Sequence, residues 1–428
     1  MLASVEKAEL TAHLKLTMVQ TDIDSGSLNQ AIERIKGGLR QALVGLVDRD
    51  AIAQLILLGA VAQEHLLIIG PPGTAKSYVV KRVSSVMGGS YFEYLLGKFT
   101  EPAELFGTID LTKLKDGRFE TQTEGMLPEA NFVFLDEIFL ASTAILNTLL
   151  SILNERKFRR GHTQMPCPLK ICVGASNHLP EDETLSAFSD RFLLTYFVAP
   201  IADPQLETLL SSGWELSQAP PLQSLNLLND IGYIQQQLSE VEMSPVISHI
   251  AEIVRALRKQ DIHLSDRRLT KLTKLVAASA ILDGRKIAQP QDLWPIVYAI
   301  QDEEQQAIAQ KSLTDKFGHT QHSLFGEAAH EAAGNLESLE SILIHKSEAL
   351  LMAYHNRLPN EKPASEKLAS EKPANEKTAS EKKNARQWSA KAEALLKQID
   401  AAFNSDNASD ALKQTRQQLA SIRSAAED

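Results

Sequence analysis

The sequence predicts an α/β fold in which a five-stranded parallel sheet is followed by a helical domain and by additional C-terminal helices. Short apolar runs alternate with helical patterns, which is typical of a parallel sheet covered by helices. These runs lie near residues 66–69, 91–95, 131–135, 169–175 and 193–198. From Asp203 to about Ile300, amphipathic segments follow one another without strand signals, which indicates a small all-helical domain.

Composition limits the class of protein. With 428 residues, 43% hydrophobic and 23% charged, the chain can bury more than one core. We expect a cytoplasmic protein with no membrane segment, because no run of about 18 apolar residues is present and the N-terminus lacks the apolar block of a signal peptide. The net charge of −10 argues against nucleic-acid binding over many base pairs. Cys167 and Cys172 are too few for a zinc site, so we expect buried reduced thiols.

The stretch "LLIIGPPGTAKSYVV", residues 66–80, has the pattern of a loop that holds nucleotide phosphates. Such a loop works between a strand and a helix N-terminus, where backbone N–H groups and the helix dipole converge on an anion. Both neighbours are predicted, because an apolar run ends at Ile69 and valines recur at helical spacing after Ser77. Lys76 would reach the β- and γ-phosphates, and the Ser77 hydroxyl would bind Mg²⁺. The alternative is an ordinary structural turn.

Ala75 occupies the position at which the usual phosphate-binding pattern has a second glycine. Its Cβ costs little free energy only if the residue has a negative φ angle. We therefore expect a negative φ at Ala75.

Acidic and polar side chains accompany the later predicted strands. The stretch "NFVFLDEIF" places Asp136 and Glu137 after a buried run, at the carboxyl edge where parallel sheets bind ligands. Asp136 would hold hydrated Mg²⁺, and Glu137 would orient and deprotonate the water that attacks the γ-phosphate. Asn177 ends the strand in "LKICVGASN" and could bond that water, and Arg191 precedes the strand in "FLLTYFV". Each of these residues could also be a solvated strand end, a cap or a surface charge, but their order along the chain favours a catalytic site.

These residues resemble those of the AAA+ ATPases, and most closely the RavA-like branch of the MoxR group. The resemblance covers roughly residues 30–300. It is carried by "GPPGTAKS" (70–77), "FEYLLGKFTEPAELFG" (92–107), "EGMLPEANFVFLDEI" (124–138), "ILNTLLSILNERKFRRG" (145–161), "GASNHLPE" (174–181), "SDRF" (189–192) and "LSDRR" (264–268). It implies an AAA+ P-loop module with a helical lid domain that binds ATP and Mg²⁺, in which alanine before the P-loop lysine is a family variant.

The resemblance also implies roles for individual residues. Asn177 is similar to sensor 1, Arg191 to the arginine finger that enters a neighbouring subunit's site, and Arg267 to sensor 2 at the start of a lid helix. Arg268 is a weaker candidate because it adjoins Arg267, and Arg156 is also explained as a charge at a helix end. By the same resemblance, the P-loop and an adenine shelf would bind the nucleotide through Gly70, Pro71, Pro72, Gly73, Thr74, Ala75, Lys76, Ser77, Tyr78, Leu46 and Val47.

The chain is predicted to contain several successive parts. In "NEKPASEKLASEKPANEKTASEKKN", Glu-Lys pairs recur and apolar residues are nearly absent, so this segment is predicted to be a solvated linker. RavA-like proteins carry a partly β accessory domain beyond the lid, and here the linker stands in its place. The predicted parts are an N-terminal helical segment (1–36) ending at a break at Gly37-Gly38, an α/β core (37–200), a helical lid (201–302), a helical extension (303–358), the charged linker (359–384) and a C-terminal helical segment (385–428).

Within the core, "DLTKLKDGRFETQTEG" predicts a hairpin insert near residues 108–125, because Asp116-Gly117 is a turn signal flanked by alternating residues. One interpretation is an exposed surface hairpin. The other, by similarity to ATPases with an insert in this helix, is an element that points toward a central pore and moves with the nucleotide state.

The C-terminal segment carries an apolar stripe at helical spacing, formed by Trp388, Ala392, Leu395, Ile399 and Phe403. The helix expected at 336–358 carries another, formed by Leu336, Leu339, Leu343, Leu350 and Leu351. We expect the two stripes to form an intramolecular bundle around the linker. The alternative is that the C-terminal stripe is a docking helix for a client.

The resemblance implies a Mg-ATP-hydrolysing ring, expected to be a hexamer, that remodels or matures a client protein together with a von Willebrand factor A (vWA) domain partner. A homo-oligomer is expected because Arg191 would complete a neighbour's site. One alternative is a nucleic-acid-stimulated motor whose contacts are Lys113, Lys115 and Arg118, although the acidic composition argues against it. Another is a slow nucleotide-gated scaffold, which the intact Glu137 argues against.

Overall fold

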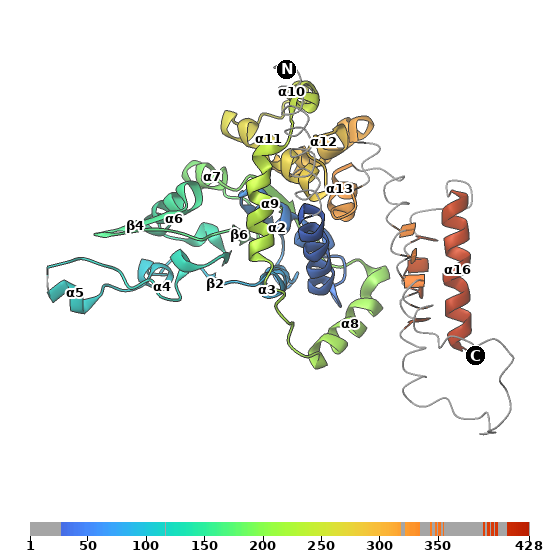
Figure 1. The fold of residues 1–428 in the computed structure, drawn as a ribbon, viewed down its shortest axis with the longest axis horizontal. Helices are drawn as coiled ribbons and strands as arrows, with labels where there is room; N and C mark the ends of the chain where they lie inside the picture. Colours follow the sequence, from blue (N-terminus) through green and yellow to red (C-terminus); the bar gives the residue numbers. More distant parts are fainter. Residues whose placement is uncertain are drawn as a thin grey trace, which may run out of the picture. The chain divides into compact units, whose positions relative to one another are not determined.

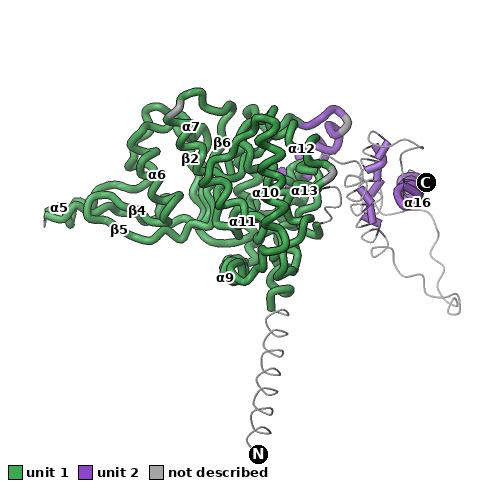
Figure 2. The backbone as a smooth tube through the Cα atoms, turned by 90° about the horizontal axis from the view of Figure 1, so that it is seen from above, with its two compact units in different colours: residues 1–200, 219–334 green, residues 201–218, 335–428 purple. Residues whose placement is uncertain are grey.

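The computed structural model describes residues 27–115, 117–317 and 322–333, helical positions scattered between 343 and 400, and residues 409–427. Its contacts divide the chain into two compact units (Figure 2). Unit 1 comprises residues 1–200 and 219–334, and unit 2 comprises residues 201–218 and 335–428. Most of the predicted N-terminal segment and the whole predicted linker lie outside the described residues. Among the helices that are described, none is long and apolar enough to cross a membrane.

Unit 1 is built on a five-stranded sheet in the order β2-β3-β6-β1-β7, in which all neighbouring strands are parallel (Figure 1). The strands are β1 (Leu66–Ile69), β2 (Tyr91–Leu95), β3 (Phe132–Asp136), β6 (Ile171–Ser176) and β7 (Leu194–Phe197). Each lies where an apolar run predicted it. The predicted α/β fold is therefore confirmed.

Helices cover both faces of this sheet, because successive strand residues enter different cores. In β3, Phe132 and Phe134 belong to one apolar cluster, whereas Val133 and Leu135 belong to the other. Burial on both faces explains why the strands are continuous apolar runs in the sequence. The helices that contribute to the first cluster include α2 (Asp50–Ala62) and α3 (Lys76–Met87), and those of the second include α4 (Pro102–Phe106) and α6 (Thr143–Glu155).

Residues 27–43 form one helix that packs on the first cluster. The predicted break at Gly37-Gly38 is wrong, because the helix continues through both glycines. A Cβ added to Gly38 would stand 2.7 Å from Cδ1 of Leu227. Gly38 thus permits a close helix contact and does not end the helix.

The predicted lid region is helical in the structure. Its elements in unit 1 are α9 (Leu228–Gln237), α10 (Ser244–Lys259), α11 (Asp266–Leu282) and the 3₁₀ turn η6 (Trp294–Ala299). Two further helices from the predicted extension, α12 (Glu303–Phe317) and α13 (Gly326–Ala333), belong to the same unit, and α13 packs against α2 and η6. By contrast, α8 (Leu206–Gln218), predicted as the start of the lid, groups with unit 2.

A hairpin lies within the predicted insert near residues 108–125. An antiparallel bridge joins Ile109 to Thr121, and the segment between them carries the short helix α5 (Leu111–Lys115). Asp116 of the predicted turn lies outside the described residues. The excursion therefore closes like a hairpin, with a helical turn in place of a regular strand.

A second hairpin, β4 (Lys157–Arg160) with β5 (Thr163–Pro166), lies beside the first at one end of unit 1 (Figure 1). The backbone N–H of His162 donates to the carbonyl of Phe119 at 2.8 Å, which joins the two hairpins. The second hairpin was not predicted. Its sequence, "KFRRGHTQMP", is polar and lacks the alternation of apolar residues that marks a strand.

Unit 2 contains a helical bundle. The rings of Tyr354 and Trp388 meet edge to face at 5.9 Å. The predicted bundle between segments before and after the linker is therefore confirmed, and α16 (Asp410–Glu427) adds a further segment to it. Its buried apolar residues are Leu343, Leu351, Ala392, Leu396, Ile399, Leu412, Leu419 and Ile422. The stripe residues outside the described part of the chain are Leu336, Leu339 and Phe403.

Candidate functional site

Residues 70–75 turn the chain from β1 into α3. Gly73 has φ +81°, and Ala75, which precedes the first residue of α3, has φ +62° and ψ 24°. The predicted negative φ at Ala75 is therefore wrong. The turn requires a left-handed backbone at this residue, which costs an L-amino acid about 1–2 kcal/mol. Such strain is characteristic of loops shaped by a ligand.

Gly70, the first residue of the loop, fits only because it has no side chain. A Cβ at this position would stand 2.3 Å from the carbonyl oxygen of Val198. The N–H of Gly70 donates to the carbonyl of Ser176 at 3.1 Å. The loop therefore begins between the ends of β6 and β7, the two strands that flank β1.

Lys76 points into this loop. Its Nζ donates to the carbonyls of Gly70 at 2.7 Å and Pro71 at 3.1 Å, and the residue is 7% exposed. Burial lowers the pKa of Lys76, and the charges of Asp136 and Glu137 oppose that shift. A phosphate would be a stronger partner for the ammonium than two neutral carbonyls, because the hydrogen bond would be charge-assisted on both sides. The loop therefore fits the phosphates of a nucleotide.

Glu137 and Asn177 are held together beside this loop. Nδ2 of Asn177 donates to Oε1 of Glu137 at 2.6 Å. The backbone N–H of Glu137 donates to Oδ1 of Asp136 at 3.0 Å, and Glu137 has φ +51°. Glu137 is thus a second strained residue at this edge. The adjacent parallel strands β3 and β6 deliver these residues from their carboxyl ends.

This arrangement supplies the groups for metal-assisted attack on a phosphate. Ser77 and Asp136 are half-buried and would hold Mg²⁺, which binds few protein ligands and shares its sphere with phosphates and water. An amide donor on one oxygen orients the carboxylate of Glu137 and leaves its other oxygen to accept a proton. Asp136, Glu137 and Asn177 therefore lie together with Lys76, as the sequence predicted.

Arg49 was missed by sequence reasoning. It is 6% exposed, and its guanidinium donates from Nε to the carbonyl of Thr74 at 2.9 Å and from Nη2 to that of Ala199 at 3.2 Å. Arg49 thereby ties the phosphate loop to the chain that leaves β7. A lone arginine in "VDRD" looks like a surface charge, so the sequence carried no signal for this role.

The predicted adenine shelf lies beside α3. Leu46 packs against the first core, and Val47 is half-buried. Arg82 of α3 secures the preceding segment, donating to the carbonyl of Val44 at 2.7 Å. Its guanidinium carbon also lies 5.6 Å from the ring centre of Tyr78, which places this predicted nucleotide-binding residue at the same end of α3.

Arg191 lies at the opposite edge of the sheet. It follows α7 (Glu183–Ser189) and precedes β7, whose first residue, Leu194, pairs with Leu66 at the start of β1. The P-loop follows the last residue of β1, and a four-residue strand is about 13 Å long. The structure therefore does not bring Arg191 to the phosphate loop of its own chain.

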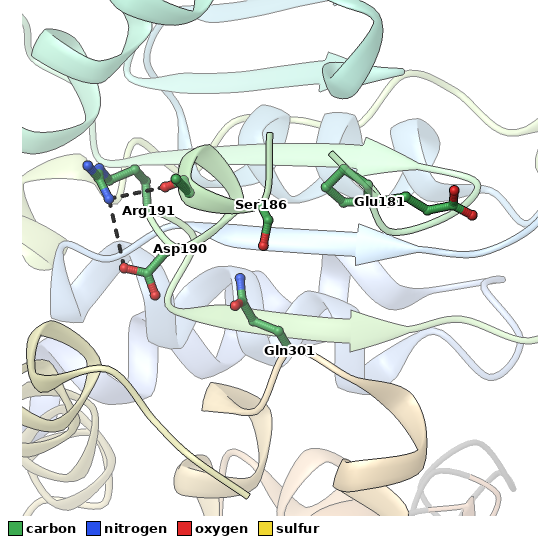
Figure 3. A pocket seen from close by; sticks show the side chains of 7 residues that line it. Glu181, Ser186, Asp190, Arg191 and Gln301 are labelled. Atoms are coloured by element: carbon green, nitrogen blue, oxygen red, sulfur yellow. Dashed lines mark hydrogen bonds and ion pairs between the residues drawn. The ribbon is translucent and has the colours of Figure 1, made fainter. Parts of the chain in front are cut away.

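Arg191 lines a surface hollow of about 500 Å³ (Figure 3). Its Nη1 donates to the carbonyl of Ala187 at 3.2 Å and lies 3.8 Å from the carboxylate of Asp190. Burial lowers the pKa of Arg191, as does the charge of Arg267, while Asp190 opposes the shift. Its Nε is buried without a hydrogen-bond partner among the described residues. The hollow is lined by Pro180, Glu181, Ser186, Ala187, Asp190, Arg191 and Gln301.

Adjacent arginines at the start of α11 have different surroundings. Arg268 is 2% exposed, and its guanidinium is bound by protein carbonyls and by Asp190. Arg267 is exposed to solvent and close enough to Arg191 to lower its pKa. Of the two, Arg267 is therefore the residue that can meet a ligand.

Arg156 and the two cysteines lie around His65, away from the phosphate loop. Arg156 follows the last residue of α6 with φ +55° and donates to the carbonyl of Gln63 at 2.8 Å; it is a helix-end charge, but it is half-buried and not a surface charge. Cys167 and Cys172 are buried free thiols, as predicted, and burial raises their pKa values to about 11 and about 12. The N–H of Cys172 donates to Nδ1 of His65 at 3.1 Å. These residues stabilise the fold.

Comparison with known protein families gives two matches. Residues 33–236 match the family described as the MoxR domain in MoxR–vWA–β-propeller ternary systems. Residues 245–313 match the AAA lid domain. The first match covers the α/β core, and the second covers the helices that follow it.

Individual relatives are similar over the same region. A protein of Methanocaldococcus jannaschii, named only as uncharacterised, is 36% identical over 248 residues, which are 58% of this chain. The match covers 64% of that relative, slightly less than two thirds of its length. The chaperone MoxR1 of Mycobacterium tuberculosis is 25% identical over 274 residues, covering 59% of this chain and 70% of that protein.

A solved structure shares the fold. The crystal structure of a candidate ATPase from Cytophaga hutchinsonii superposes with a TM-score of 0.56 and 20% identity, covering 70% of this chain and 98% of that one. The sheet, the phosphate loop and the family matches agree with one another. Residues 33–236 are therefore similar to a MoxR domain and residues 245–313 to an AAA lid domain, on the α/β fold of AAA+ proteins.

Proposed function

We propose that this chain is a Mg²⁺-dependent ATPase that assembles into a homo-oligomeric ring, a hexamer, and remodels or matures a client protein. The observation that carries the proposal is the convergence of Lys76, Glu137 and Asn177 at the carboxyl edge of one parallel sheet. The match to a MoxR domain and an AAA lid supports the same class of activity.

Each residue of the site has a task in this proposal. The phosphates of ATP would lie at the N-terminus of α3, where Lys76 exchanges its carbonyl partners for phosphate oxygens. Mg²⁺, held through Ser77 and Asp136, would supply charge neutralisation at the phosphates. Glu137 would accept a proton from the attacking water, while Asn177 keeps its carboxylate in place.

Arg191 would serve the nucleotide of a neighbouring subunit, and Arg267 would act as sensor 2 at the start of α11. Two observations support this role for Arg191: it lies at the sheet edge opposite its own phosphate loop, and it lines a surface hollow. A cation placed at a neighbour's γ-phosphate would stabilise the charge of the transition state. The activity would then require assembly, because a single chain does not bring Arg191 to its own phosphate loop.

We also propose a partner with a vWA domain. The support is the name of the matched family, which describes MoxR, vWA and β-propeller proteins as one ternary system. The finer assignment to a RavA-like branch stays a prediction, since the matched family is named for those ternary systems. Chaperone activity is supported by the name of the Mycobacterium tuberculosis relative.

The nucleic-acid alternative gains little from the insert hairpin. Lys113, one of the proposed contacts to nucleic acid, forms an ion pair with Glu120, which neutralises its charge. Lys115 and Arg118 are exposed. We therefore favour a protein client.

The experiment that tests the proposal measures ATP hydrolysis by the purified chain with and without Mg²⁺, alongside its mass in solution with ATP. We expect Mg²⁺-dependent turnover by an oligomer and none by Lys76→Ala, the matched control. Separate reactions add a candidate vWA protein, single-stranded DNA or RNA. Stimulation by nucleic acid alone would favour the motor, and an assembled protein without turnover would contradict the ATPase.

A further inference from the structure

The loop that carries Arg191 is attached to the lid through its neighbour, Asp190. Oδ1 of Asp190 accepts a hydrogen bond from Nε of Arg268 at 2.9 Å and another from the hydroxyl of Ser265 at 3.2 Å. Ser265 also caps α11, since its hydroxyl accepts from the N–H of Arg268. The carboxylate therefore binds the first turn of a lid helix.

Arg268 also holds the backbone on the other side of Arg191. Its Nη2 donates to the carbonyl of Phe192 at 2.6 Å, and its Nη1 donates to that of Leu193 at 3.0 Å. Nη1 donates in addition to the carbonyl of Ala299, at the end of η6, at 2.7 Å. One buried guanidinium thus joins α11, η6 and the loop, and its planar fork suits several acceptors at once.

A second attachment comes from Gln301. Its Nε2 donates to the hydroxyl of Ser189, the last residue of α7, at 3.0 Å. The residues on both sides of Arg191 are therefore bonded to the lid. The Arg191 guanidinium is bonded instead to the carbonyl of Ala187, in the preceding helix α7, and Arg191 lines the hollow (Figure 3).

We propose that Arg268 and Asp190 are positioning residues that fix the Arg191 guanidinium relative to lid helix α11. This inference rests on the proposed function, in which Arg191 reaches a neighbour's nucleotide. Arg267, the preceding residue on α11, is carried by the same helix turn. A displacement of the lid therefore moves Arg191 and Arg267 together, so the lid of one subunit sets the charge at the next subunit's site.

Because Arg268 and Asp190 form an ion pair, the choice of substitution that tests their role depends on which charge is removed. Removing Arg268 would take away the closest cation of Asp190 and leave the buried carbonyls of Phe192, Leu193 and Ala299 without that donor, which destabilises the fold. Asp190→Asn keeps the shape and one oxygen acceptor but removes the charge, so it weakens the attachment with the smallest change in packing. Asp182→Asn is the matched control, because Asp182 caps the start of the same helix through the N–H groups of Thr184 and Leu185.

For Asp190→Asn we expect kcat to fall roughly 10- to 100-fold, since a misplacement of about 1 Å can cost that much. The KM for ATP stays within about twofold, because the residues that bind a subunit's own nucleotide lie at the other sheet edge. Amide exchange of residues 187–193 becomes faster, while exchange of residues 70–77 does not change. Asp182→Asn shows none of these effects.

Mixed oligomers separate positioning from general damage. Lys76→Ala subunits retain an intact Arg191, so they restore turnover to Asp190→Asn subunits, whose phosphate sites are intact. Arg191→Ala subunits do not. Turnover of Asp190→Asn at the unmodified rate, or a defect that Lys76→Ala subunits fail to rescue, overturns the positioning role.

The parallel mixture of Arg191→Ala with Lys76→Ala tests the proposed function itself. If that mixture stays inactive, the action of Arg191 on a neighbour fails, and the positioning inference fails with it. If it is rescued and the Asp190→Asn mixture is not, only the positioning inference fails. Should Asp190→Asn not fold, Gln301→Ala releases the other attachment and is judged by the same mixtures.

Discussion

Asn177 donates a hydrogen bond from its side-chain amide to Oε1 of Glu137 across 2.6 Å. The two residues end adjacent strands, so this contact sets the direction of the carboxylate at the sheet edge. Glu137 is therefore held in the orientation that a general base needs.

Glu137→Gln should keep ATP binding and slow hydrolysis roughly 100- to 10,000-fold, because the base is lost while the shape is kept. Nucleotide affinity and single-turnover rates measure the two effects separately. Asn177→Ala should give a smaller loss of kcat, since the carboxylate remains but is no longer held. Unchanged turnover of Glu137→Gln would remove this residue from the mechanism.

Arg191→Ala should lower hydrolysis by roughly 1,000-fold or more if the guanidinium acts as other arginine fingers do. Lys76→Ala should lose nucleotide binding, because the phosphates lose the P-loop ammonium. Mixing the two variants should restore part of the activity, since each supplies the group that the other lacks. Absence of rescue in oligomers shown to be mixed would count against action on a neighbouring site.

Ala75→Gly should leave the free energy of unfolding nearly unchanged or slightly raised. Glycine relieves the left-handed strain at φ +62°, about 1–2 kcal/mol, but adds roughly 0.4–1 kcal/mol of unfolded-chain entropy. Ala144→Gly, at an exposed position in α6, is the control and should lose up to about 1 kcal/mol. Chemical denaturation compares them, and equal losses at both positions would show that Ala75 carries no strain.

Glu331 should make stability depend on pH. Burial, and then the charges of Glu327 and Asp48, raises its pKa to about 8 from a usual value of 4.5. The folded state therefore keeps a proton that the unfolded state releases above pH 4.5. The contribution of Glu331 to the free energy of unfolding is fully present below pH 4.5. It declines as the pH rises from 4.5 to 8, by at most about 1.4 kcal/mol per pH unit.

Glu331→Gln removes this titration. Denaturation from pH 4.5 to pH 8 should show a variant that matches the unmodified protein at the acid end and becomes relatively more stable toward pH 8. Glu303→Gln, at an exposed position on α12, serves as the control. A difference that does not change with pH would contradict the raised pKa of Glu331.

Deleting residues 385–428 should expose one side of the bundle in unit 2. Leu343 and Leu351 would lose their apolar partners, among them Ala392 and Leu396. Hydrogen exchange around residues 343–354 should then accelerate strongly, because burial no longer protects that segment. Unchanged protection after the deletion would contradict the bundle, and rapid exchange throughout residues 387–403 without a client would favour a docking helix.

The strands and the acid pair were predictable because they depend on local chemistry. A strand buried on both faces requires a continuous apolar run, which can be recognised in the sequence. Because parallel sheets bind ligands at the carboxyl ends of their strands, Asp136 and Glu137 could be predicted as site residues from their position directly after such a run. The angle at Ala75 was not predictable. Alanine prefers a negative φ, but the turn that joins β1 to α3 requires a left-handed backbone at this position.

Long-range contacts account for the other differences. Gly38 looked like a helix break because its partner, Leu227, is distant in sequence. Arg267 and Arg268 are identical in chemistry, and the positions of Asp190 and of three backbone carbonyls distinguish the buried residue from the exposed one. Arg49 was missed for the same reason, since its acceptors lie in remote loops.

Two hydrogen bonds between His162 and Phe119 join the two hairpins, so that we expect the hairpins to move together. The N–H of His162 donates to the carbonyl of Phe119, and the N–H of Phe119 donates to Nδ1 of His162 at 3.0 Å. The second hairpin continues directly from α6, and the chain reaches α6 from Glu137 through the 3₁₀ turn η2 (Ile138–Leu140). If α6 rotates when the position of Glu137 changes, both hairpins would be displaced together. The exposed side chains of Leu111 and Leu114 would then move with them.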